Sequence, residues 1–128
     1  MEVSILIADD DPMSQQIFAQ ILPTEGYSVH IAQDGRAAME LLQKHKFTLI
    51  LLDIEMPNLN GFEVLRLVRQ NYSMMQRPVI MVTAQGDRSD ILKAYDLGAN
   101  DYVTKPIDIQ VVLARIRAHI AMQKEKRE

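Results

Sequence analysis

The chain of 128 residues contains no cysteine, which excludes disulfide bonds, thiolate catalysis and cysteine-based zinc sites. It also has no apolar run approaching the roughly 20 residues that a membrane helix requires. Its 14 basic residues are outnumbered by 17 acidic ones, a balance that argues against a nucleic-acid-binding face. The first apolar run begins almost at Met1, which leaves no room for a signal peptide. We therefore expect a cytoplasmic domain without membrane or direct nucleic-acid contacts.

Short apolar runs rich in branched residues alternate five times with segments of helical periodicity. The predicted strands span residues 3–8, 27–32, 47–53, 78–83 and 101–105, and the predicted helices span 12–22, 36–45, 62–70, 89–97 and 108 to at least 121. Strict alternation favours right-handed crossovers and a parallel sheet with helices on both faces. The length fits one domain, so we expect an α/β fold with a doubly wound five-stranded parallel sheet in the flavodoxin-like order 2-1-3-4-5.

Acidic residues directly follow two of the predicted strands. Asp9 and Asp10 come after the first strand, and Asp53 ends the third. In the order 2-1-3-4-5 these strand ends are neighbours at the crevice where such sheets bind ligands. Carboxylates gathered this closely repel one another, and each disfavours the ionisation of the next. The sequence therefore predicts a metal site built around one reactive aspartate, with the Thr83 hydroxyl and the Lys105 ammonium at the same edge.

Four segments at strand ends resemble the receiver domain of bacterial two-component response regulators. They are ILIADDDP at residues 5–12, LDIEMP at 52–57 with Gly61, VTA at 82–84 and GANDYVTKP at 98–106. The resemblance covers essentially the whole chain and implies a receiver domain over residues 1–121. Residues 122–128 would form a C-terminal helical extension or the start of a linker, since they retain good helix formers without a stop signal.

The resemblance implies that Asp53 accepts a phosphoryl group from a histidine kinase or a histidine phosphotransfer protein. A carboxylate can act as the nucleophile in such a transfer. The accompanying cofactor would be Mg²⁺, with Mn²⁺ as an alternative. By analogy, Asp10, Asp53 and the main-chain carbonyl of Glu55 would ligate the metal directly, and Asp9 would act mainly through water. We expect a switch rather than an enzyme, with only self-directed phosphoryl transfer and autodephosphorylation.

The same resemblance implies roles for residues at the ends of the last two strands. Lys105 would pair with Asp53 at rest and with a phosphoryl oxygen afterwards. The hydroxyl of Thr83 and the amide N–H of Ala84 would bind another phosphoryl oxygen. Inward movement of Thr83 would let Tyr102 turn and remodel the surface of the fourth helix, fifth strand and fifth helix. That surface would control an output domain beyond residue 128 or another partner, and a phosphorylation-dependent homodimer is a further option.

Several neighbouring positions carry alternative interpretations. Asp11, before Pro12, fits a helix cap better than a metal ligand. Asn60 stands where receivers often have an aspartate, and both residue types cap helices. Glu55 and Gln85 occupy positions that tune phosphoryl lifetime in the family, and the sequence leaves that lifetime open.

Three other classes of protein compete with the receiver interpretation. A haloacid-dehalogenase-type phosphatase would also use Asp53 as a nucleophile with Mg²⁺. It would, however, want an aspartate where Glu55 stands and a cap domain for which the chain has little room. A flavin-binding flavodoxin would need a hydroxyl- and glycine-rich phosphate loop in place of the acidic residues 9–11. A phosphorylation-independent interaction module would not require this combination of acidic residues, threonine and lysine.

Overall fold

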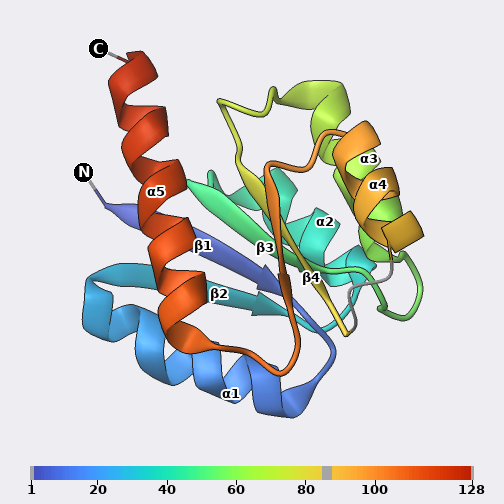
Figure 1. Cartoon of the computed structure of the whole chain (residues 1–128), viewed down its shortest axis with the longest axis horizontal. Helices are drawn as coiled ribbons and strands as arrows, with labels where there is room; N and C mark the ends of the chain where they lie inside the picture. Colours follow the sequence, from blue (N-terminus) through green and yellow to red (C-terminus); the bar gives the residue numbers. More distant parts are fainter. Residues whose placement is uncertain (1, 85–87, 128) are drawn as a thin grey trace.

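Five parallel strands form one sheet that helices cover on both faces (Figure 1). The computed structural model describes residues 2–84 and 88–127. The strands are β1 (Val3–Ala8), β2 (Tyr27–Ala32), β3 (Leu49–Asp53), β4 (Val79–Thr83) and β5 (Asp101–Thr104). They lie in the order β2-β1-β3-β4-β5, which confirms the predicted topology.

The helices fall close to their predicted positions. They are α1 (Pro12–Ile21), α2 (Gly35–Lys44), α3 (Gly61–Asn71), α4 (Arg88–Asp96) and α5 (Ile109–Arg127), and a short 3-10 helix, η1 (Leu22–Glu25), follows α1. The turn into β2 is made by Gly26, whose φ of 87° lies in the left-handed region. Within the described part of the chain, no helix has the length and apolar character needed to span a bilayer.

The central strand is β3, and all five of its residues are buried, as expected for a strand covered on both faces. It pairs with β1 on one side and β4 on the other. β2, the more polar strand, lies at an edge of the sheet, as predicted. β3 starts later than predicted, at Leu49. Just before it, the Ser4 N–H donates to the hydroxyl of Thr48 (3.1 Å) instead of to a ladder carbonyl.

Alternate side chains of the strands enter one of two apolar cores, following the period of two along a strand. Leu6 and Ala8 pack with side chains of α2, α3 and α4, whereas Ile5 and Ile7 pack with those of α1 and α5. Figure 1 shows α1 and α5 on the near face of the sheet and the other helices behind it. Because both faces are filled by apolar side chains, polar groups gather where the strands end.

Side chains at two predicted helix starts satisfy the first amides of α1 and α3. Asp11 accepts from the Met13 N–H (3.1 Å) and the Ser14 hydroxyl (3.0 Å), and these bonds lower the pKa of its carboxyl. Asn60 and Glu63 form a capping box, in which each side chain accepts from the other residue's N–H (3.0 and 3.2 Å). Both caps confirm the prediction and fix the chain shortly after β1 and β3, where the acidic residues lie.

At the amino ends of β4 and β5, Arg69 on α3 holds several loops together. Its guanidinium donates to the main-chain oxygens of Gly98 (2.8 Å) and Arg77 (2.9 Å) and to Asn100 Oδ1 (2.8 Å). The same Asn100 oxygen accepts from the Val79 N–H (2.9 Å). No carboxylate of the described residues shifts the pKa of Arg69, which burial lowers to about 10. The guanidinium therefore acts as a shared donor for part-buried carbonyl oxygens.

Replacing Arg69 with glutamine should lower the free energy of unfolding by about 2–3 kcal/mol, because the acceptors around it lose their donor. Arg66→Gln is the control, since this arginine is exposed on the same helix. It should change the free energy by less than about 0.5 kcal/mol. Urea denaturation of both variants measures the difference, and equal effects would contradict the structural role of Arg69.

Candidate functional site

Three carboxylates meet at the carboxyl ends of β1 and β3. Oxygen atoms of Asp9, Asp10 and Asp53 lie within 4.8 Å of one another. Asp9 and Asp53 are buried, whereas Asp10 is exposed. The register places Ala8 beside Leu52, so the residues that follow them reach the same edge of the sheet. The structure thus brings together the acidic residues that the sequence singled out.

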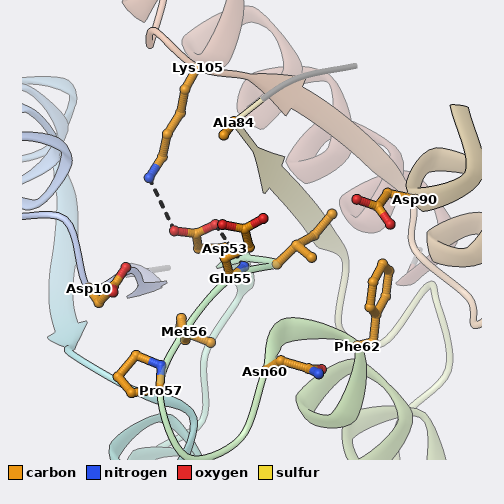
Figure 2. A pocket seen from close by; sticks show the side chains of 11 residues that line it. Asp10, Asp53, Glu55, Met56, Pro57, Asn60, Phe62, Ala84, Asp90 and Lys105 are labelled. Carbon is orange, nitrogen blue, oxygen red and sulfur yellow. Dashed lines mark hydrogen bonds and ion pairs between the residues drawn. The ribbon is translucent and has the colours of Figure 1, made fainter. Parts of the chain in front are cut away.

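Lys105 brings a positive charge into this cluster. Its Nζ donates to Asp53 Oδ2 (3.1 Å) and Asp9 Oδ1 (3.2 Å) and lies 3.7 Å from Asp11 Oδ2. Figure 2 shows the lysine reaching toward Asp53 from the other side of the cleft. Burial alone would lower the pKa of Lys105, but hydrogen bonds and attraction from Asp53 and Asp9 raise it. The Lys105–Pro106 bond is cis.

Crowding changes the acidity of Asp53. Burial raises its pKa most, the charge of Asp9 raises it further, and the hydrogen bond and charge of Lys105 oppose both. The net result is a pKa of about 7, against an ordinary value of 3.8. One ammonium does not compensate for burial together with the neighbouring Asp9 carboxylate. The ionised form of Asp53 is therefore poorly stabilised by the protein alone.

The donor atoms of the cluster fit a hard divalent cation, which prefers carboxylate and carbonyl oxygens. Asp9 Oδ2 is buried without a hydrogen-bond partner, a costly state for a carboxylate oxygen unless a cation meets it. Asp9 Oδ1, in contrast, accepts from the Asp11 N–H (2.9 Å). Glu55 adjoins the cluster, and its N–H donates to Asp53 Oδ1 (3.2 Å). The set of residues present is therefore suited to holding a metal ion.

A cleft of about 750 Å³ opens beside the cluster. Five of the predicted site residues line it, namely Asp10, Asp53, Glu55, Ala84 and Lys105. Thr83, the last residue of β4, is buried, and its main-chain oxygen accepts from the Lys105 N–H (2.7 Å). Gln85, to which the sequence assigned an effect on phosphoryl lifetime, lies outside the described residues.

Two glycines allow the loop after β3 to pack closely against the site and α2. A Cβ at Gly61 would lie 2.2 Å from the main-chain oxygen of Asp53, and a Cβ at Gly35 would lie 2.1 Å from that of Leu59. The Gly61 N–H also donates to the Ile54 oxygen (2.8 Å). Gly61 belongs to a recognised motif, but sequence reasoning missed the role of Gly35 because contact with a distant loop leaves no local pattern.

Tyr102 on β5 is half-buried and belongs to a network with α4 and α5. Its ring meets that of Tyr95 edge-on at 6.1 Å between centroids, and Arg115 donates to its main-chain oxygen. Arg115 also lies 3.5 Å from Asp101 Oδ1, and His119 Nε2 lies 3.1 Å from Asp101 Oδ2. Sequence reasoning pointed to Tyr102 but missed these polar neighbours, whose spacing gives no motif of its own.

A family model described as the response regulator receiver domain matches residues 5–117. The chain belongs to this family. The matched span contains the acidic cluster, the threonine and the lysine, so the receiver interpretation of the fold and the general function is confirmed. The comparisons give no support to the phosphatase alternative.

Two curated relatives set the receiver domain in a longer chain. This chain is 40% identical over 122 residues to the response regulator ArlR of Staphylococcus saprophyticus, and the alignment covers 95% of this chain and 54% of that protein. It is 41% identical over 124 residues to YkoG of Bacillus subtilis, named an uncharacterized transcriptional regulatory protein, covering 97% of this chain and 54% of that protein. The receiver domain thus spans about half the length of these relatives.

Among solved structures, the receiver domain resembles a CheY-like response regulator receiver domain protein from Methanospirillum hungatei. The TM-score is 0.90 at 28% sequence identity, and the alignment covers 98% of this chain and 99% of that chain. This agreement extends over the whole fold, including the sheet edge at which the acidic cluster lies.

Replacing Asp53 with asparagine should stabilise the metal-free receiver domain, and more so at about pH 8 than at about pH 5. The folded protein retains the Asp53 proton up to a pKa of about 7, whereas the ordinary value is 3.8. Folding stability therefore falls as the pH rises from about 4 through about 7, and the whole loss is present above that range. Asparagine avoids this loss because it does not ionise.

Thermal unfolding with a chelator present measures this effect at the two pH values. We expect a gain in midpoint of about 3 °C or more for Asp53→Asn at the higher pH. The control Glu40→Gln, at an exposed carboxylate on α2, should change the midpoint little at either pH. If the gain for Asp53→Asn did not depend on pH, the cost of ionising Asp53 would not be its cause.

Proposed function

We propose that this receiver domain accepts a phosphoryl group on Asp53 from a histidine kinase or a histidine phosphotransfer protein. The observation that carries the proposal is the position of Asp53, a buried carboxylate bound by Lys105 at the floor of an open cleft. Family membership supports a partner of this kind. We further propose that the domain acts in the cytoplasm and works as a switch. Its only reactions would be self-directed phosphoryl transfer and autodephosphorylation.

The transfer forms one bond and breaks one. A carboxylate oxygen of Asp53 attacks phosphorus, and the phosphorus–nitrogen bond of the donor breaks with its electron pair leaving on the imidazole. Asp53 must be ionised to attack, and the Lys105 ammonium at 3.1 Å favours that form. After transfer, the same ammonium is placed to pair with a phosphoryl oxygen, so the product retains a charged partner.

Mg²⁺, or Mn²⁺ in its place, is the cofactor we propose for this site. Asp10, Asp53 and the main-chain carbonyl of Glu55 would hold it directly, and Asp9 would do so mainly through water. When bound, the ion supplies positive charge to the phosphoryl oxygens. The orphaned oxygen Asp9 Oδ2 and the raised pKa of Asp53 support this assignment, because both describe negative charge that the protein leaves uncompensated.

Thr83 is the last residue of β4, and Ala84 follows it directly. We propose that the Thr83 hydroxyl and the Ala84 N–H donate to a second phosphoryl oxygen. Ala84 lines the cleft, and Thr83 is joined to Lys105 through the main-chain bond of 2.7 Å. A phosphoryl group at Asp53 would therefore be contacted from two adjacent strand ends at once.

The conformational change caused by phosphorylation would pass from Thr83 to Tyr102. Thr83 pairs with Thr104 in the sheet register, and Met81 pairs with Tyr102, so movement at the end of β4 reaches β5 directly. Tyr102 also contacts α4 and α5 through Tyr95 and Arg115. We propose that its reorientation remodels the α4–β5–α5 face, which would control an output domain or a phosphorylation-dependent homodimer.

The proposed output domain would follow residue 128. The curated relatives are about twice as long as this chain, which supports a second domain. We propose residues 1–121 as the receiver domain and 122–128 as the helical extension toward the output domain. α5 is continuous to Arg127, and Gln123 still donates to the main-chain oxygen of Gln76 (3.0 Å), so the extension leaves from a helix held against the domain.

Incubation with acetyl phosphate tests the phosphoacceptor role. With Mg²⁺ we expect about one phosphoryl group per chain, carried on Asp53 as an acyl phosphate. A chelator added before the reaction should prevent this labelling. Asp53→Asn should reduce labelling to background. The matched control is Asp96→Asn, at an exposed aspartate at the end of α4, which should be labelled normally. Mass spectrometry of the intact protein and its peptides gives the readout, and wild-type labelling of Asp53→Asn would overturn the proposal.

A further inference from the structure

An acidic residue outside all the recognised motifs lines the same cleft as Asp53. Asp90 lies in the first turn of α4 and is half-buried. Its side chain belongs to the lining of the cleft. Figure 2 shows the Asp90 carboxylate beside Phe62, across the cleft from Asp10. The cleft is therefore acidic on the α4 side as well as at the cluster.

The charges around the cleft do not balance, even when a divalent cation is counted. The charged residues among those lining it are Asp10, Asp53, Glu55, Asp90 and Lys105, with Asp9 directly behind. Lys105 and a divalent cation together would offset the three aspartates of the cluster. Glu55 and Asp90 would then remain as negative charge that no other lining residue among those the structure describes offsets. Any phosphoryl donor that enters the cleft is itself an anion and meets this field.

We propose that Asp90 discriminates among phosphoryl donors by repelling free dianionic ones. This inference rests on the proposed phosphoacceptor role of Asp53. A small donor such as acetyl phosphate has no contacts elsewhere with which to offset the repulsion. A phosphohistidine carried by a partner protein can offset the repulsion, because protein–protein contacts remote from the reacting group contribute binding energy. Asp90 is a specificity-determining residue and takes no part in the transfer itself.

The size of the effect follows from Coulomb's law. A like charge across a solvent-filled cleft, with an effective dielectric constant between those of a protein surface and water, changes the rate with a dianionic donor about three- to tenfold. The repulsion grows with the charge of the donor. It should also vanish in about 1 M salt, where charges are screened over about 3 Å.

The test compares two small donors that differ in charge. Acetyl phosphate is a dianion at neutral pH, whereas phosphoramidate carries a net single negative charge. The measured quantity is the second-order rate constant for Mg²⁺-dependent phosphorylation of Asp53. For Asp90→Asn we expect about a three- to tenfold rise with acetyl phosphate and about a two- to threefold rise with phosphoramidate at low salt, because the repulsion energy is proportional to the charge of the donor. High salt should remove the difference between this variant and the wild type.

Two control variants distinguish an effect of the charge at position 90 from an effect of altered structure and from an effect of the net charge of the protein. Asp90→Glu retains the charge and should retain the wild-type ratio of the two rate constants. Asp96→Asn makes the same change in net charge at the far end of α4, away from the cleft lining, and should also leave the ratio unchanged.

The proposal is overturned if Asp90→Asn leaves the donor ratio unchanged, lowers the rate with acetyl phosphate, or behaves like Asp96→Asn. It is equally overturned if the effect persists in high salt. These outcomes leave the phosphoacceptor role intact, because Asp53 would still be labelled. If neither donor labelled Asp53 in the wild-type protein, the proposed function and this inference would both be contradicted.

Discussion

The contact of Lys105 with two buried carboxylates, Asp53 and Asp9, is the interaction on which the rest of the site depends. The winding of the sheet brings acidic strand ends to one edge, so folding must overcome their mutual repulsion. The ammonium offsets part of that repulsion, but burial and the charge of Asp9 still raise the pKa of Asp53 to about 7. Negative charge left in an open cleft favours a divalent cation and, next to it, an electrophile such as phosphorus.

The same lysine ties the charge state of the cluster to the backbone. Its N–H donates to the Thr83 oxygen (2.7 Å), and β5, the strand directly before it, carries Tyr102 at the junction with α4 and α5. A group that gave Asp53 new charge would compete for the Lys105 ammonium and act on both strand ends.

Sheet order and the acidic cluster were predictable because both follow from alternation of strands and helices. Once β1 and β3 are neighbours, Asp9 and Asp53 must meet, whatever the details of packing. Other features depend on how distant surfaces pack, which local periodicity does not encode. Arg69 binds oxygens from loops around β4 and β5, and Asp90 reaches the cleft only because α4 docks beside the loop after β3. The start of β3 also differs from the prediction, and there the hydroxyl of Thr48 accepts from the Ser4 N–H.

The central claim is that the cluster holds uncompensated charge that a divalent cation relieves, with Asp53 giving up its proton in the process. Calorimetric titration with Mg²⁺ in buffers of different ionisation enthalpy measures that proton directly. Because the pKa of Asp53 without metal is about 7, binding at about pH 7 should release about half a proton per site, and more at lower pH. Absence of Mg²⁺ binding, or binding without proton release at any pH between about 5 and 7, would contradict the account.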